Sequence, residues 1–551
     1  MSLRNHWRAG GLAALLMLAQ SAHADENPAE RQSMEELRNT VINLLQALVQ
    51  KGLLTREQAE ALVKQAQDKA AADAAALAAQ NSVQGKEDQN AVRVPYVPQI
   101  VKDEISKQVA QEVKPAVVAD VVKQAKEEKW GVPAALPDWL SRVRVFGDVT
   151  VRYQGDLYPR DNSFDQIYDY QAINTAGGIL ATTYPFLDTT SDRNRVRDRA
   201  RLGAEANITP YVKAVVRLST GSLVDPGSES QNEGTYAERY SVAFDQAYIA
   251  WNTSPADKLS AYTLEGGRLP NPWFAPTELI YARDLTFEGV YTTMRLGWGA
   301  GGAERSHVFL TLGGSPILEV PLLNEDNKWL AGAQLGTHLR FFDGADRLAL
   351  AIAYYDFTNV TGQKNQPDST LLNFTAPAFV RAGNTMFDII NSTNPNNTAN
   401  LFALAAHFRL ANVAATYEHY FGPYSVAVTG DAVRNVAYNL AQVEALAGQL
   451  MPSEENVGYV GEVSFGNPVV DRFGLWRVAV GYRYVKRDAV IDAWTDADFH
   501  EGGTNTKGYY VWGSYGLTQN TWLRLRYMSG NEIDGPAYGL DVVQLDVNAR
   551  F

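Results

Sequence analysis

From residue 142 onward, apolar and polar positions alternate along the chain with a period of two. In the segment 142–154 most odd positions carry Val or Tyr, and most even positions carry Arg, Asp, Thr or Gln. The alternation returns in the segments 196–208, 212–218, 290–298, 331–341, 348–354, 476–484 and 523–527. A strand places successive side chains on opposite faces, so each segment predicts a β-strand with one apolar and one polar face.

The connections between these strands fall into two length classes. Short links are expected at 209–210, 253–257, 343–346, 411–412, 467–471 and 518–520. Long polar segments are expected at 155–192, 221–240, 268–284, 358–399, 421–455 and 487–506. Tight turns at one rim and long loops at the other are typical of outer-membrane barrels, whose turns lie in the periplasm and whose loops lie outside the cell. The pattern therefore predicts an all-β transmembrane barrel of antiparallel strands.

The predicted strand number is about sixteen, an even number within the range of such barrels. Weakly alternating segments at 259–267, 306–312 and 457–465 leave two or four strands more or fewer open. The last segment, 540–551, alternates clearly and ends in Phe551. A terminal Phe after such a strand resembles the signal that the barrel insertion machinery binds as an added strand. We expect this segment to close a barrel that extends over residues 140–551.

Residues 25–130 have the pattern of a helical segment with a linker. Leu37, Val41, Leu44 and Leu48 alternate in spacings of four and three, which places one apolar stripe along a helix. Gly52 interrupts the stripe, so two short helices and a longer coiled coil between copies of the chain both fit. Either reading gives an α-helical or coiled-coil extension in the periplasm ahead of the barrel.

Residues 1–24 have the pattern of an export signal. Arg4 and Arg8 precede an apolar run at 9–19, and Ala22 and Ala24 supply the small side chains of a cleavage site. The run is shorter than the about 20 residues that span a bilayer as a helix. We interpret residues 1–24 as a signal peptide, which places the mature barrel in the outer membrane and the segment after it in the periplasm.

Composition narrows the class of protein. The mean hydropathy of −0.24 resembles that of a soluble protein, but a barrel with a polar lumen also has this value because only alternate residues face lipid. The absence of cysteine excludes disulfides, thiolate-bound zinc and thiol catalysis. A net charge of −13 argues against nucleic-acid binding, which requires a basic contact face.

Signals for catalysis or for a cofactor are weak. The seven histidines are scattered, and the HExxH, GxSxG and GxxxxGK[ST] patterns are absent. Acids cluster at Asp492, Asp496, Asp498 and Glu501, without the spacing of a calcium loop. We interpret this cluster as a solvated acidic loop, and we predict no enzyme activity, no cofactor and no metal site.

Several short motifs, taken in order, resemble a known family. They are residues 44–62 (LLQALVQKGLLTREQAEAL), the strand from Val143 to Tyr153, the Arg-rich second strand, and residues 244–251 (FDQAYIAW), 266–274 (GGRLPNPWF) and 283–289 (RDLTFEG). Together they resemble the putative porins of Proteobacteria that join a helical amino-terminal segment to a large barrel. The resemblance implies passive transport of small solutes across the outer membrane, without naming a solute.

Arginines gather on the polar face of the first three strands, namely Arg144, Arg152, Arg195, Arg197, Arg199, Arg201 and Arg217. Neighbouring strands bring such side chains close together, so we expect a basic strip along one wall of the pore. Further lumen arginines are expected at Arg340, Arg477, Arg483, Arg524 and Arg526, spread around the barrel.

The third long loop, 268–284, is expected to fold inward opposite the basic strip. Arg268, Glu278 and Asp284 complete the predicted pore lining, and the two acids supply the opposing charge. A transverse field of this kind attracts anions. Alternatively, the arginines pair with acids such as Asp198 and Glu205 and line a wide, unselective pore.

The sequence thus predicts an outer-membrane porin for small hydrophilic solutes, with an anion preference. Its expected partners are outer-membrane lipid, lipopolysaccharide and two further copies of the chain in a homotrimer. An alternative is an envelope tether, whose helical segment binds peptidoglycan or another periplasmic partner.

Overall fold

The computed structural model describes residues 142–254, 260–299, 305–321 and 327–551. The predicted signal peptide and helical extension lie outside these ranges. Sixteen long strands in the described ranges form one closed antiparallel sheet, so the predicted barrel class and its approximate strand number are confirmed. The long strands are β1 (Val143–Leu157), β2 (Arg193–Asn207), β3 (Val212–Thr220), β5 (Val242–Asn252), β6 (Tyr262–Pro270), β7 (Thr286–Trp298), β8 (Ser306–Leu318), β9 (Lys328–Phe341), β10 (Asp346–Thr358), β13 (Phe408–Phe421), β14 (Tyr424–Asn435), β15 (Val457–Gly466), β16 (Trp476–Val485), β17 (Thr506–Thr518), β18 (Thr521–Glu532) and β19 (Gly539–Arg550).

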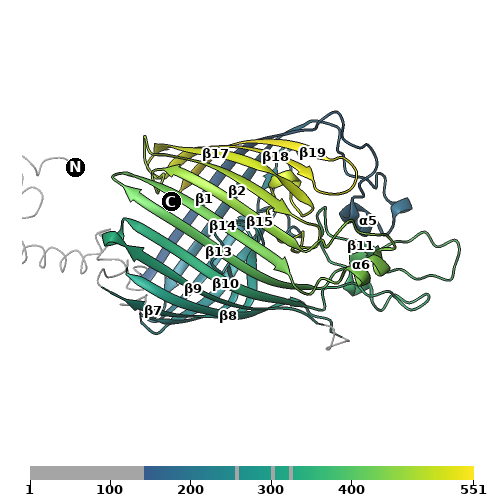
Figure 1. The fold of residues 1–551 in the computed structure, drawn as a ribbon, viewed down its shortest axis with the longest axis horizontal. Coiled ribbons are helices and arrows are strands. Elements are labelled where there is room, and N and C mark those ends of the chain that lie inside the picture. Colours follow the sequence, from purple (N-terminus) through teal and green to yellow (C-terminus); the bar gives the residue numbers. More distant parts are fainter. Residues whose placement is uncertain (1–141, 255–259, 300–304, 322–326) are drawn as a thin grey trace, which may run out of the picture. The chain divides into compact units, whose positions relative to one another are not determined.

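The first and last strands close the sheet. β1 pairs with β2 on one side and with β19 on the other, and the register sets Thr150 opposite Asn548 and Arg152 opposite Asp546. Figure 1 shows the carboxy-terminal strands, in yellow, beside the first strands, in blue. Closure leaves none of these sixteen strands as a free edge, and side chains from the two ends of the barrel sequence meet on one wall.

Alternation separates the two faces of the wall as predicted. Outward side chains are apolar and accessible, as for Val149, Leu202 (51% exposed) and Leu545. Inward side chains on the same strands are polar and buried, as for Thr150 and Gln544. This outward apolar surface fits the hydrocarbon of a bilayer, because its exposure to water would be unfavourable.

The tight turns and the long connections lie at opposite ends of the barrel. One predicted link is wrong: β13 runs straight through Ala411 and Asn412, and the side chain of Asn412 donates a 2.7 Å hydrogen bond to Asp431 in the interior. The turn instead uses Gly422 and Pro423, where Gly422 takes a φ of +60° that few other residues adopt. The following long connection therefore begins at residue 436, after β14 has crossed the wall.

The long connections carry the remaining short elements, and they gather at one end of the barrel in Figure 1. These elements are β4 (Gln231–Asn232), α5 (Tyr170–Ala176), η4 (Ile179–Ala181), η8 (Asn373–Thr375), β11 (Met386–Asp388), β12 (Phe402–Leu404), α6 (Leu440–Ala447) and η9 (Phe499–Glu501), while η7 (Phe342–Gly344) lies in the short β9–β10 link. No described helix has the length and apolar character needed to cross a membrane.

The loops share an apolar core with the inner face of the wall. Ile389, Ala403, Val443 and Val490 are almost fully buried and belong to one cluster with side chains of the wall. Burying these side chains stabilises the packed arrangement by about 1.5–3 kcal/mol for each large one. The loops therefore form a packed mass within the barrel mouth, which we call the loop plug (residues 271–285, 359–407, 436–456 and 486–505).

Aromatic rings on the inner face lie over glycines of the neighbouring strand. A Cβ atom at Gly313 would lie 2.0 Å from Cδ1 of Tyr291, and one at Gly336 would lie 2.3 Å from Cζ of Phe309. The Tyr291 hydroxyl also forms a hydrogen bond with Ser315. Glycine at these positions allows the ring to lie flat on the sheet.

We predict that Gly313→Ala destabilises the barrel by about 1–3 kcal/mol, because the added methyl displaces Tyr291 from a packed site. The midpoint of urea unfolding in micelles measures the effect. Gly430→Ala is the matched control, since a Cβ atom there would meet nothing within 4 Å. Equal midpoints for the two variants would contradict the prediction.

Candidate functional site

The connection between β6 and β7, residues 271–285, folds into the barrel. It forms hydrogen bonds with Gln334 of β9 (2.7 Å), Asp431 of β14 (2.6 Å) and Arg199 of β2 (3.0 Å). These three strands lie on different parts of the wall, so the loop crosses the interior. We call residues 271–285 the inward loop.

The middle of the inward loop is apolar and fixed in the loop plug. Leu279, Tyr281 and Ala282 are buried, and the backbone N–H of Ala282 donates a 2.6 Å hydrogen bond to the carbonyl of Trp494. The ring of Tyr281 meets that of Tyr355 edge-on, with 5.3 Å between centroids. Packing on both sides holds the charged ends of the loop in place.

The arginines of β1, β2 and β3 have polar partners drawn from facing strands and loops. Charged partners are Glu205 for Arg144 (3.7 Å), Asp546 and Asp498 for Arg152 (2.7 and 2.9 Å), Asp156 for Arg195 (2.6 Å), Asp284 and Asp148 for Arg199 (3.0 and 3.3 Å), Asp148 and Glu229 for Arg201 (2.8 and 3.2 Å), and Glu229 and Asp245 for Arg217. Arg197 donates to neutral groups, Gln154 (3.2 Å) and Ser228 (3.3 Å).

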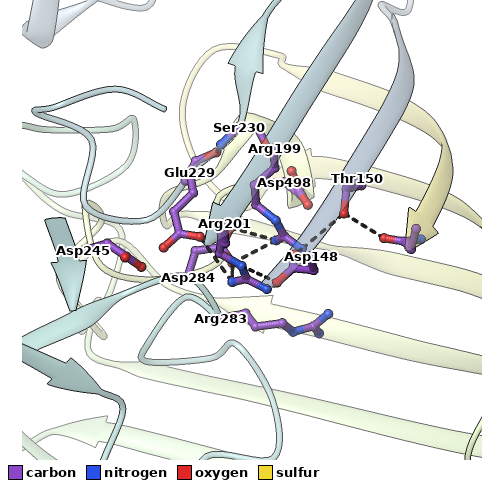
Figure 2. Close-up of polar contacts among 12 residues, drawn as sticks. Asp148, Thr150, Arg199, Arg201, Glu229, Ser230, Asp245, Arg283, Asp284 and Asp498 are labelled. Atoms are coloured by element: carbon purple, nitrogen blue, oxygen red, sulfur yellow. Dashed lines mark hydrogen bonds and ion pairs between the residues drawn. The ribbon is translucent and has the colours of Figure 1, made fainter. Parts of the chain in front are cut away.

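Asp284 reaches from the inward loop toward Arg199 and Arg201 of β2, as Figure 2 shows. Burial alone would raise the pKa of Asp284, but the two guanidinium groups outweigh it and lower that pKa. Burial and the charge of Asp284 raise the pKa of the neighbouring Glu229 to about 9, against the effect of its arginine partners. The guanidinium groups therefore favour the charged form of Asp284, whereas burial favours the protonated form of Glu229.

A cavity of about 250 Å³ lies between the inward loop and the wall formed by β1, β2, β18 and β19. Its charged lining comprises seven arginines and five carboxylates, namely Arg152, Arg199, Arg201, Arg283, Arg524, Arg526, Arg550, Asp148, Glu278, Asp284, Asp498 and Asp546. Cations outnumber anions even when every carboxylate is ionised. We call this space the charged cavity.

Two arginines are especially open to an ion in the charged cavity. The side chain of Arg283 is 59% exposed although Glu278 lies 3.0 Å away. The guanidinium of Arg524 lies 4.5 Å from the ring centroid of Trp512, and no carboxylate in the described ranges pairs with it. Such cations keep part of their field available to a passing solute.

One predicted lining residue points elsewhere. Arg268 shares the outward parity of Leu264 on β6, and it pairs at 2.6 Å with Glu288, which shares the outward parity of Val290 on β7. Arg268 therefore lies on the outer side of the external rim, outside the proposed lumen lining. Glu278 and Asp284 border the charged cavity, whereas Arg144 lies near the end with the tight turns.

Sequence reasoning did not place the arginines of β18 and β19 beside those of β1. Arg524, Arg526 and Arg550 border the same cavity as Arg152 because β19 pairs with β1. Closure of a barrel always joins the first strand to the last, so this neighbourhood could have been inferred from the predicted fold.

The interpretation of residues 492–501 as a solvated acidic loop is wrong. Asp498 accepts hydrogen bonds from Arg152 (2.9 Å) and Arg526 (3.2 Å), and Asp492 is 1% exposed. Burial raises the pKa of Asp498, but these arginines outweigh it and hold that pKa well below its usual range. Asp498 lies inward because the wall supplies two arginines that form ion pairs with it.

Asp492 lacks such a partner. Neither carboxylate oxygen accepts a hydrogen bond from the described residues, and the charges that act on its pKa include Arg381 and Asp488. Burial raises the pKa of Asp492 to about 8, against a weaker lowering effect of Arg381 and of backbone N–H groups. The carboxyl is therefore largely protonated at neutral pH.

A family model described as "Putative porin" matches residues 38–551. The fold is similar to that of OprB from Pseudomonas putida (10% identity, 77% of this chain and 97% of that chain, TM-score 0.43). It is also similar to the outer membrane channel DcaP of Acinetobacter baumannii (12%, 74% and 97%, TM-score 0.37) and to the trimer form of OmpT from Vibrio cholerae (10%, 74% and 99%, TM-score 0.37). No curated protein matches the chain.

We predict that Asp492 makes the stability of the loop plug depend on pH. Between the unfolded pKa of about 3.9 and the folded pKa of about 8, only the folded state holds the proton, so stability falls as pH rises through this window. In Asp492→Asn this loss should disappear, giving a gain of about 2–4 kcal/mol near pH 8.5 and little change near pH 4.

Hydrogen-exchange protection of residues 486–505, followed across this pH range, measures the effect. Asp161→Asn, which changes an exposed acid in the loop after β1, serves as the control. The same pH dependence in Asp492→Asn as in the parent chain would contradict the prediction.

Proposed function

The chain belongs to the putative porin family, and from this membership we propose that small hydrophilic solutes diffuse passively through its lumen, with a preference for anions. The family and the closed barrel make the chain an outer-membrane porin. Nothing in the family or the fold points to catalysis. Two finer parts of the proposal are the passage of solutes past the charged cavity and the preference for anions.

One observation carries the anion preference, namely the surplus of cations around the charged cavity. Glu229, which lies 3.2 Å from the lining residue Arg201, has a pKa raised by burial, so its neutral form is favoured beside this surplus. Fixed charges in a narrow, low-dielectric passage act on ions more strongly than the same charges in bulk water. An anion entering the cavity would meet Arg283 and Arg524 before any carboxylate free of a cation.

The close pairing of the wall arginines limits the preference. Each carboxylate at 2.6–3.3 Å from a guanidinium cancels most of its field at longer range. We therefore propose a moderate preference rather than strict anion selectivity. The ion-paired arginines and carboxylates of the wall also keep the passage polar and hydrated, so both sugars and small organic ions can pass.

The remaining parts of the proposal concern assembly and localisation. We propose that residues 1–24 are removed on export, that residues 25–130 lie in the periplasm, and that the barrel contacts lipid and lipopolysaccharide as a homotrimer. The alternative tethering role rests on residues outside the described ranges, and no observation on the described ones favours it.

We predict that the purified chain conducts ions. Stepwise increases in current should appear when it is added to a planar bilayer, because the lumen is lined by polar side chains and the charged cavity lies between the inward loop and the wall. Heat-denatured protein is the control. A correctly folded chain that inserts without any conductance would overturn the porin proposal.

We predict that Arg283→Gln lowers the chloride-over-potassium permeability ratio about two- to fivefold, since a unit charge in aqueous surroundings contributes about 1 kcal/mol at 4 Å. The reversal potential in a potassium chloride gradient measures the ratio. The parent chain should favour chloride, and cation selectivity in the parent would refute the anion preference.

Arg434→Gln provides a matched control for this substitution. Arg434 has the same exposure (60%) and the same kind of carboxylate partner, Glu454 at 3.2 Å, but it does not border the charged cavity. Its replacement should leave the reversal potential unchanged. An equal change in both variants would show that Arg283 acts through net charge and not through its place in the lumen.

A further inference from the structure

A second cavity, of about 500 Å³, lies apart from the charged cavity, between the external ends of β7, β8 and β9 and the loop plug. Its lining is mainly apolar and includes the aromatic side chains of Phe287, Phe374, Phe379 and Trp494. The volume falls within the range of about 300–1,000 Å³ that is usual for small-molecule sites. We call it the apolar cavity.

One cation borders the apolar cavity from the inside. Lys328, the first residue of β9, is 4% exposed, and its Nζ donates a single hydrogen bond of 3.0 Å to the carbonyl of Thr375. No carboxylate in the described ranges lies within ion-pair distance of it. An ammonium group has three donors, so two remain available to a ligand.

The other polar groups of the apolar cavity are already satisfied. Arg268 and Glu288 neutralise each other at 2.6 Å, and both are well exposed (41% and 54%). The hydroxyl of Ser315 is bonded to Tyr291. The cavity therefore combines an apolar surface with one buried positive charge that has no counter-ion among the residues that the structure describes.

We propose that the apolar cavity binds an organic monocarboxylate with an apolar body. The carboxylate accepts hydrogen bonds from Nζ of Lys328, and the body packs among Phe287, Phe379 and Trp494. A buried ammonium without a counter-ion costs free energy, and a bound carboxylate removes that cost. An uncharged apolar molecule would fill the same space but would leave the cation unpaired.

This site is distinct from the proposed solute route, since no residue borders both the apolar and the charged cavity. Binding can therefore be tested without reference to conductance. The failure of either proposal leaves the other standing.

The test uses the purified full chain in lipid nanodiscs and titration calorimetry with 4-phenylbutyrate as the probe. We expect saturable binding that is at least about tenfold tighter than that of 4-phenylbutanol, because charge-assisted hydrogen bonds are stronger than neutral ones. Lys328→Met should weaken the binding of the acid about tenfold or more, whereas Lys328→Arg should retain most of it. Lys507→Met, which changes a lysine of β17 that does not border the cavity, is the control.

A second variant tests the cavity itself while keeping the lysine. Ala376→Trp places a large ring in the cavity and should abolish binding of the acid. The comparison of acid and alcohol on the parent chain needs no variant, so misfolding of a variant does not remove the test. Equal affinities for acid and alcohol, unchanged binding by a folded Lys328→Met, or no saturable binding by the parent chain would each overturn the proposal.

Discussion

The pairing of β1 with β19 is the constraint on which the rest of the structure depends. It satisfies the backbone groups that would otherwise form two free edges in a bilayer, where unpaired groups are costly. It also fixes which side chains share a wall, because the register sets Arg152 opposite Asp546 and Asp148 opposite Arg550. A charged lumen wall is thus built from the two ends of the barrel sequence, and neither end alone would contain it.

Closure of the barrel places polar side chains in a confined interior, where arginines and carboxylates form ion pairs. An isolated guanidinium buried there would lose hydration, whereas a partner such as Asp148 beside Arg201 offsets most of that loss. The inward loop and residues 486–505 contribute Asp284 and Asp498 for the same reason. Pairing therefore holds the loops against the wall, and the few cations without close partners, such as Arg524, set the remaining charge of the lumen.

The local pattern of the sequence was enough to predict the barrel, its inward and outward rows, and the loop that enters the lumen. The prediction from the pattern was wrong at Asn412. Asparagine is typical of turns, yet this residue lies in the middle of a strand, where its side chain donates a hydrogen bond to Asp431 of the neighbouring strand. Arg268 was assigned to the lumen although its parity with Leu264 already indicated the outer face. The burial of Asp492 and Asp498 could not be predicted, because it depends in part on contacts with Asn384 and Arg152, which lie more than 100 residues away in the chain.

The loop plug explains why the charged cavity and the apolar cavity differ in character. The apolar centre of the inward loop packs against Trp494 and Tyr355, and this packing separates the charged ends of the loop from the apolar side chains behind it. Packed interiors resist small displacements, since each shift loses many contacts at once. The inward loop, which borders the charged cavity, and side chains that line the apolar cavity consequently belong to one shared core.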